Sequence, residues 1–258
     1  MTRRLVRQVR LFFGPGLAGA VWFALSSSVV AAGMNFAGVP VVPGGTVRAE
    51  VPLSAVEKSY VSEGGNPVPP YTVAVLAVPR GFDPARSWHV LVVFSTSDFK
   101  IQNRDDLKNL YAPTALAEGW VVIAGDGLVP APGKDSSGWR AGHTLAALDA
   151  LQRSFPGAKN WPVACAGYSG GAKRAGLLTP LLAVAGYHIC GLFLTGINED
   201  TITEGYRKFK PGNAYLETPI FLSVGTEDKV ATPPQQMMAK ASMQRAGFGN
   251  IRLETFPN

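Results

Sequence analysis

Short runs of β-branched and other apolar residues alternate with longer helical segments along most of this 258-residue chain. The runs are continuous and rich in Val, Ile and Leu, which is typical of strands that are covered on both faces. They read TVRAEVPL, YTVAVLAVP, HVLVVFS, WVVIAGDG, WPVACAG, ICGLFLTG, PIFLSVG and IRLETF. Because strands that alternate with helices form parallel sheets with helices on both faces, the pattern predicts an α/β fold with a mostly parallel sheet of about eight strands.

The first two runs differ from the others, because only turn-type residues (EGGNPVPP) are evident between them. We therefore expect them to pair antiparallel at one edge of the sheet. Helix signals follow: Pro113 opens a helix that Gly119 closes, Ser136 or Ser137 caps GWRAGHTLAALDALQRSF, and Pro233 opens PPQQMMAKASMQRAG. We interpret YRKFKPGN as a charged surface loop.

Length and composition are those of one globular domain. The chain is 47% hydrophobic and 16% charged, and 258 residues are enough for one α/β domain with a substantial core. No internal repeat is present. We assign residues 33–45 to a Pro- and Gly-rich leader and residues 46–258 to the domain.

The first 32 residues resemble a secretory signal peptide. Four arginines in MTRRLVRQVR precede the apolar LFFGPGLAGAVWFAL and the small residues of SSSVVAAG. Without this segment the net charge of +6 falls to +2, so the basic balance does not indicate a nucleic-acid partner. We predict export to the periplasm or the medium, without stable membrane insertion after signal cleavage. An uncleaved membrane anchor remains the alternative.

The two cysteines, Cys165 and Cys190, lie inside runs that we expect to form neighbouring strands. We favour free core thiols, although export would permit a disulfide. The sequence has no C-x-x-C pair and no His/Cys cluster, and it has no phosphate-binding or dinucleotide-binding loop. We therefore predict neither a metal nor a cofactor.

The pentapeptide GYSGG, residues 167–171, lies between the apolar WPVACA and the helical AKRAGLLTPLL. A serine hydroxyl needs a base and oxyanion donors before it can act as a nucleophile. When G-x-S-x-G joins a buried strand to a helix, the serine occupies a sharp, strained turn that exposes its hydroxyl. The backbone N–H of the following residue, Gly170, then points toward the developing charge. The context therefore predicts that Ser169 is a nucleophile.

From residue 45 onward the chain resembles the α/β-hydrolase superfamily, of the single-domain serine esterase type. The resemblance is carried by HVLVVFSTSD, GWVVIAGDG, GYSGG and PIFLSVGTEDKVATP, in that order. It implies that Ser169 is the nucleophile, that Asp228 is the acid, and that Gly170 with Thr96 or Ser97 supplies the oxyanion hole. Where many members have His-Gly this chain has the residues of FSTS, so the identity of the second oxyanion donor stays open.

Two further residues remain alternatives for the acid and the base. Asp200 follows the GLFLTGIN run and could act as the acid instead of Asp228. The resemblance places the catalytic histidine just after the last strand, IRLETF, and the sequence reaches Asn258 two residues later. We therefore expect the general base beyond Asn258, which the source gene can test. Of the three histidines, His143 is the candidate base, whereas His89 and His188 precede strands.

The expected function is an exported serine hydrolase that cleaves carboxylic esters through an acyl-enzyme. About 20 residues, between Asn198 and Thr218, separate the ICGLFLTG run from the PIFLSVG run. This is too few for a large lid, so we expect an open site for a small or polymeric ester. A catalytically silent binding protein with the same fold, and an acyltransferase with the same nucleophile, are the alternatives. The sequence does not define the oligomeric state.

Overall fold

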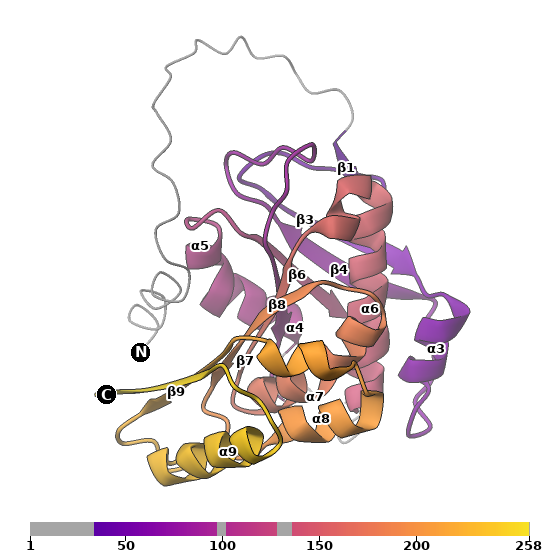
Figure 1. The fold of residues 1–258 in the computed structure, drawn as a ribbon. Coiled ribbons are helices and arrows are strands. Elements are labelled where there is room, and N and C mark those ends of the chain that lie inside the picture. Colours follow the sequence, from indigo (N-terminus) through magenta and orange to yellow (C-terminus); the bar gives the residue numbers. More distant parts are fainter. Residues whose placement is uncertain (1–33, 97–101, 128–135, 258) are drawn as a thin grey trace, which may run out of the picture.

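The computed structural model of the chain describes residues 34–96, 102–127 and 136–257. Its centre is a twisted eight-stranded sheet with the order β10-β9-β8-β7-β5-β6-β4-β3 (Figure 1). Strand β4 pairs antiparallel with β3 and β6, and the other neighbouring pairs are parallel. This confirms the predicted sheet and its antiparallel edge. The strands are β3 (Thr46–Pro52), β4 (Tyr71–Ala77), β5 (Val90–Phe94), β6 (Val121–Asp126), β7 (Val163–Tyr168), β8 (Ile189–Thr195), β9 (Ile220–Gly225) and β10 (Ile251–Phe256).

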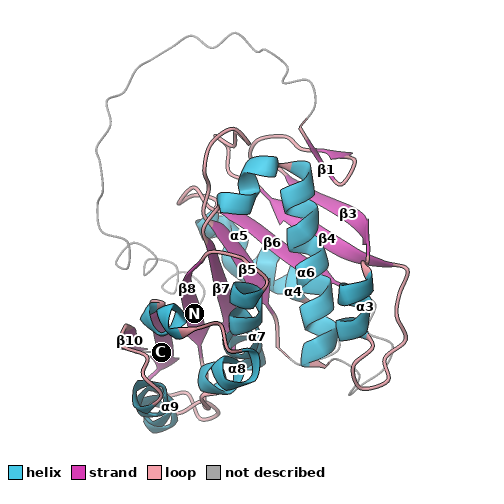
Figure 2. Cartoon of the chain, turned by 45° about the vertical axis from the view of Figure 1, so that its right-hand side comes forward, coloured by secondary structure: helices cyan, strands magenta, loops and turns pink. Residues whose placement is uncertain are grey.

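Helices lie on both faces of this sheet (Figure 2). The larger apolar cluster packs α6, α7 and α9 against one face, and the smaller cluster packs η2 and α5 against the other. The helices are α3 (Ala55–Val61), α4 (Asn103–Asp106), the π-helix η2 (Leu107–Tyr111), α5 (Ala112–Ala115), α6 (Ser137–Ser154), α7 (Gly170–Val184), α8 (Thr201–Phe209) and α9 (Pro233–Arg245), with 3₁₀ turns η3 (Pro156–Asn160) and η4 (Asn213–Glu217).

Local cap signals predicted two helices correctly. Ser136 is the N-cap of α6 and accepts a hydrogen bond from the Trp139 N–H, and Pro233 begins α9. Pro113 lies at the start of α5, as predicted, but that helix continues a helical segment that begins ten residues earlier with α4. Its first N–H groups, those of Asn103 and Arg104, donate to the buried carboxylate at the end of β6. The local part of this start is Asp105, whose Oδ2 accepts from the Gln102 N–H at 2.9 Å, whereas the cap from Asp126 comes from a distant part of the chain.

Two helices, α3 and α8, were not predicted from the sequence. Helix α3 lies between the two antiparallel edge strands, and Ser54 and Glu57 form a capping box at its start. The residues of YRKFKPGN begin inside α8, not in a loop, because Asp200 caps that helix and it ends only at Lys210, which has a left-handed backbone. The segment between β8 and β9 is therefore largely helical, without a large lid.

The leader packs onto the domain. Its short strands β1 (Asn35–Phe36) and β2 (Val39–Pro40) pair antiparallel, and Phe36 and Val41 are buried in the larger core cluster. Packing of the described chain thus begins at its first residues. Residues 1–32, to which the signal-peptide prediction applies, lie outside the described residues. Within residues 34–96, 102–127 and 136–257, no helix is long and apolar enough to cross a membrane.

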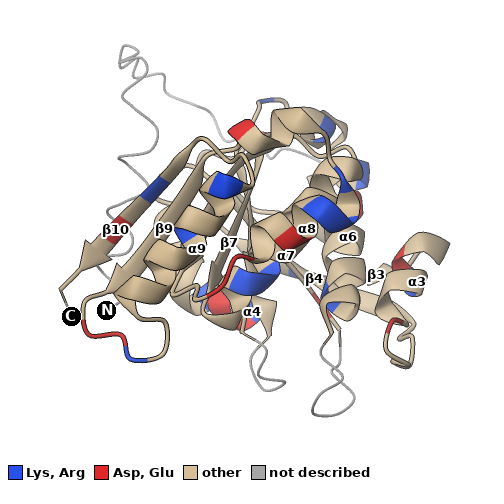
Figure 3. Cartoon of the chain, turned by 60° about the horizontal axis from the view of Figure 1, so that its bottom comes forward, with Lys and Arg blue, Asp and Glu red and all other residues tan. Residues whose placement is uncertain are grey.

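The two cysteines are free thiols, as the sequence analysis favoured. Cys165 belongs to the larger core cluster, whereas Cys190 packs against the smaller one. The two clusters lie on opposite faces of the sheet, so these side chains point apart although β7 and β8 are neighbours. Acidic and basic positions are interspersed over the described chain (Figure 3).

Candidate active site

Ser169 occupies a strained turn between β7 and α7. Its backbone has φ 53° and ψ −120°, a conformation that side-chain-bearing residues rarely adopt, and Gly170 begins the helix at once. The Ser169 N–H donates to the Thr195 carbonyl at the end of the neighbouring strand, at 2.8 Å. Ser169 itself is partly exposed. The predicted sharp strand-to-helix turn is therefore present, and its serine is accessible.

The glycines on either side of Ser169 are required by close backbone packing. A Cβ on Gly167 would lie 2.2 Å from the carbonyl of Gly171, and a Cβ on Gly171 would lie 2.1 Å from the Phe94 carbonyl oxygen. The first contact packs the end of β7 against the start of α7, and the second packs the start of α7 against the end of β5. Larger residues at either position would push the serine away from these neighbours.

The close contact with β5 brings the predicted oxyanion donors near the serine. Gly170 is the first residue of α7, so its N–H has no partner in the helical ladder. Thr96 follows the end of β5, against which Gly171 packs. Ser97 lies outside the described residues. Two of the three predicted donors are thus placed on segments that meet at the strand-to-helix turn of residues 167–171, which we call the elbow.

Asp228 lies in the turn after β9, at the same edge of the sheet as Ser169. Its Oδ1 accepts hydrogen bonds from the N–H groups of Val230 and Ala231, both at 2.8 Å, which holds the turn in shape. A Cβ on Gly196 would lie 3.8 Å from the Ser169 nitrogen and 3.9 Å from the Ala231 Cβ. The elbow and the Asp228 turn therefore meet over the same glycine.

Asp200, the alternative acid, follows the strand between those two elements. Its Oδ1 caps α8 by accepting from the Thr203 N–H at 2.9 Å. Its Oδ2 is buried and has no hydrogen-bond partner among the described residues. The structure therefore brings both carboxylates to the edge that bears Ser169, and it gives Asp200 a clear structural role as a helix cap.

The structure places His143 in the core. It is fully buried in α6, its Nδ1 lies 2.6 Å from the Thr72 hydroxyl, and its ring meets Trp139 edge-on at 4.4 Å. A Cβ on Gly127 would lie 2.2 Å from its Nε2. Burial, followed by the positive charge of Arg140, lowers the pKa of His143 to about 3. These contacts make it a neutral packing residue, which argues against its predicted role as the base.

The other two histidines lie at the opposite edge of the sheet. His89 directly precedes β5 and stacks beside Trp120, and His188 directly precedes β8. Burial lowers the pKa of His89, and the charge of the neighbouring His188 lowers it further. Both rings therefore stand at the amino ends of the strands, away from Ser169, as the sequence predicted.

The buried His143 predicts acid sensitivity. Unfolded histidine binds a proton near pH 6.5, whereas folded His143 does so only near pH 3, so stability falls as the pH drops below about 6.5. We expect wild type to lose about 2 kcal/mol more unfolding free energy than His143→Gln between pH 7 and pH 5. Urea unfolding at both pH values measures this difference. Equal losses in the two proteins would contradict it.

Sequence reasoning missed a buried polar network beside the site. Asp126 ends β6, Arg140 lies in α6, and Asn103 begins α4; all three are fully buried. Desolvation raises the pKa of Asp126, and the Arg140 guanidinium opposes that shift. The signal available in the sequence was an acid ending an apolar run, but its partners are distant in the chain.

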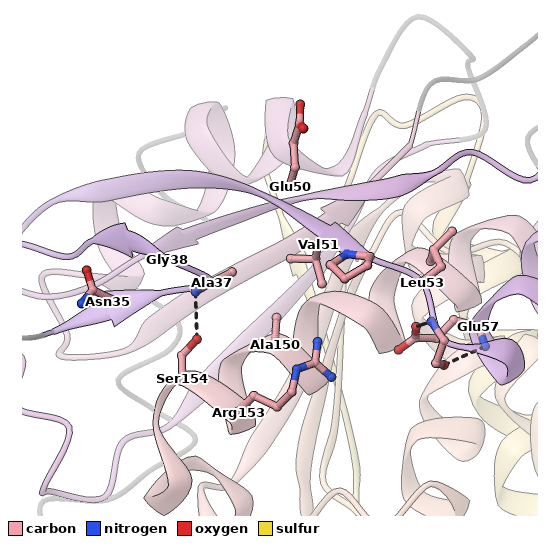
Figure 4. Close-up of a pocket in the computed structure, with 12 residues that line it drawn as sticks. Asn35, Ala37, Gly38, Glu50, Val51, Leu53, Glu57, Ala150, Arg153 and Ser154 are labelled. Atoms are coloured by element: carbon pink, nitrogen blue, oxygen red, sulfur yellow. Dashed lines mark hydrogen bonds between the residues drawn. The ribbon is translucent and has the colours of Figure 1, made fainter.

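A separate cavity of about 680 Å³ lies between the edge strand β3 and helix α6 (Figure 4). Residues of β1, β3, α3 and α6 line it, among them Glu50, Glu57 and Arg153. None of these elements carries Ser169 or Asp228, so this cavity is not part of the candidate active site. Within the described ranges no group of three His, Cys, Asp or Glu residues is arranged to hold a metal ion.

Comparison with known proteins shows the fold. No protein-family model and no curated protein matches the chain. Solved structures do match: an esterase from the Planctomycetes species Thermogutta terrifontis has TM-score 0.53 and 14% identity, covering 81% of each chain. The acylaminoacyl peptidase of Pyrococcus horikoshii has TM-score 0.52 and 10% identity, covering 83% of this chain but 37% of the peptidase. The chain has the α/β-hydrolase fold that its motifs predicted.

Proposed function

We propose that this protein is an exported serine hydrolase that cleaves carboxylic esters through an acyl-enzyme on Ser169. One observation carries the proposal: Ser169 is held in a strained backbone conformation between two glycines that tolerate no side chain. Strain of this kind costs free energy and persists where function requires it. An ordinary turn serine at the start of a helix would need neither the positive φ nor the two contacts.

In the proposed reaction the Ser169 Oγ attacks the ester carbonyl carbon as a base removes its proton. The N–H groups of Gly170 and Thr96 stabilise the oxyanion, and the alcohol leaves with a proton when the tetrahedral intermediate collapses. Water then attacks the acyl-enzyme by the same steps and releases the acid. Asp228 is the carboxylate that orients the base in this reaction, and Asp200 is the second candidate for that role.

Side chains around the serine favour an accessible ester with an apolar group. Tyr168, directly before the nucleophile, is 38% exposed, and Val230, in the Asp228 turn, is 74% exposed. Exposed apolar side chains beside a nucleophile provide contact area for an acyl or alcohol group. The likeness to an esterase over most of both chains, and to only a third of a peptidase, agrees with an ester substrate.

Covalent labelling tests the proposal. The full-length protein is treated with a fluorophosphonate, digested and mapped by mass spectrometry. We expect one adduct at Ser169, no labelling of Ser169→Ala, and unchanged labelling of Ser154→Ala, a matched control serine that accepts a hydrogen bond from the Ala37 N–H far from the site. Wild-type protein that remains unlabelled would contradict the proposal.

A catalytically silent binding protein is the second candidate. One observation favours it: in the part of the chain that the structure describes, no hydrogen bond joins a histidine to Ser169 or Asp228. A serine without a base does not react with fluorophosphonates at a useful rate. The same labelling experiment therefore separates the two candidates, since only the enzyme forms an adduct.

A further inference from the structure

The end of β5 is fixed by a buried side chain from α4. The Ser95 N–H donates to the Asn103 Oδ1 at 2.9 Å, and the Ser95 hydroxyl donates to the same oxygen at 3.2 Å. Both residues are fully buried. Ser95 directly precedes Thr96, so the side chain of Asn103 determines where the chain leaves the strand.

Asn103 is itself held on every side. Its Nδ2 donates to the Gly125 carbonyl at 3.0 Å, its own N–H donates to the Asp126 Oδ1 at 2.9 Å, and the Arg140 Nη1 donates to its Oδ1 at 2.6 Å. Arg140 also pairs with Asp126 at 3.4 Å, with both side chains fully buried. The amide of Asn103 is therefore locked in one orientation.

A buried ion pair is a poor source of stability, since desolvating both charges offsets most of their attraction. What the Arg140–Asp126 pair does provide is a defined direction for the Asn103 amide oxygen, which accepts the Ser95 N–H. This network therefore specifies the local geometry at the end of β5.

The geometry that it specifies reaches the nucleophile. A Cβ on Gly171 would lie 2.9 Å from the Ser95 carbonyl carbon, so the elbow rests directly against the residue that Asn103 holds. A shift of Ser95 would move Thr96 relative to Ser169. Misplacement by about 1 Å can cost about 100-fold in rate.

We infer that Asn103 is a positioning residue that, locked by Arg140 and Asp126, sets the distance between the Thr96 oxyanion donor and Ser169. This inference rests on the proposed function. Oxyanion donors act mainly on the transition state, so their displacement lowers kcat while leaving substrate binding nearly unchanged.

Steady-state hydrolysis of a p-nitrophenyl ester by the full-length protein, well below its melting temperature, tests the inference. Asn103→Ala is expected to lower kcat about 100-fold with KM changed by less than about twofold. Asn103→Asp keeps an oxygen for the Ser95 N–H and for Arg140 but loses the donor to the Gly125 carbonyl, and is expected to recover part of kcat. Ser154→Ala, whose hydroxyl accepts from the Ala37 N–H far from this network, serves as the control, with wild-type kcat.

Hydrogen exchange provides a readout independent of activity. The Ser95 amide is expected to exchange about tenfold faster in Asn103→Ala than in wild type and in Asn103→Asp. Folded Asn103→Ala with wild-type kcat, or with unchanged exchange at Ser95, overturns the inference. An inactive, unlabelled wild type overturns the proposed function and with it the catalytic part of the inference, whereas faster exchange at Ser95 in Asn103→Ala still supports its structural part, that Asn103 holds the end of β5.

If Asn103→Ala does not fold, Arg140→Lys replaces it. Lysine keeps the positive charge beside Asp126 but loses the guanidinium donor to the Asn103 Oδ1. This variant is expected to lower kcat and leave KM unchanged.

Discussion

Asp228→Asn is expected to lower kcat about 10⁴-fold in the full-length protein, since an amide cannot stabilise the protonated base or hold it in the required tautomer. The substitution leaves the turn intact, because the asparagine Oδ1 still accepts from the N–H groups of Val230 and Ala231. KM and the melting temperature are therefore expected to change little. Ester hydrolysis at saturating substrate, with a thermal melt of each protein, measures both effects.

Asp200→Asn is the matched control for this prediction. Asparagine is as good an N-cap as aspartate, so it still accepts from the Thr203 N–H and α8 persists, with a cost below about 1 kcal/mol. We expect kcat to stay within about threefold of wild type, as for a residue with no part in the chemistry. The reverse pattern, a large loss in Asp200→Asn and a small one in Asp228→Asn, would exchange the roles of the two acids.

The features that could be predicted from the sequence are those with local signals. The GYSGG elbow is marked by its glycines and its position between a buried strand and a helix, and the Asp228 turn is marked by the strand before it. Both lie at the carboxyl ends of parallel strands, and that edge is common to all parallel strands of a sheet. The location of the candidate site therefore follows from sequence pattern alone.

The features that could not be predicted depend on contacts between distant residues. Asn103, Asp126 and Arg140 lie on three elements, and no spacing in the sequence indicates that they share one buried network. The start of α4 was missed partly for the same reason, since Asp126 caps it from a distant part of the chain in addition to the local Asp105. His143 has the residue type of a base, but only its surroundings show that it is a packed neutral ring.

Helix α3 shows a different kind of miss. Its capping box, Ser54 with Glu57, is a local signal that the sequence contains in full. It was hidden by the turn-forming residues that follow it, which suggested a plain hairpin between the two edge strands. Here the error lay in weighing two local signals, and the burial of Glu57 and Val61 shows that the helix is packed rather than incidental.

Gly171→Ala is expected to destabilise the protein by about 3 kcal/mol or more, because a rigid backbone group, not a flexible side chain, occupies the space of the new methyl. Its Cβ would lie 2.1 Å from the Phe94 carbonyl oxygen, so either α7 or the end of β5 must move. That movement also separates Ser169 from Thr96, and kcat is expected to fall even where the protein remains folded. Chemical unfolding and ester hydrolysis on the same preparation measure the two effects.

Gly81→Ala provides the control for this change, because a Cβ on Gly81 would meet nothing within 4 Å. Its unfolding free energy is expected to stay within about 0.5 kcal/mol of wild type, as for other surface substitutions. The comparison separates the general cost of replacing a glycine from the cost of opening this contact. If Gly171→Ala matched Gly81→Ala in stability and wild type in kcat, the elbow would not need its close contact with β5, and the strained serine would lose its structural explanation.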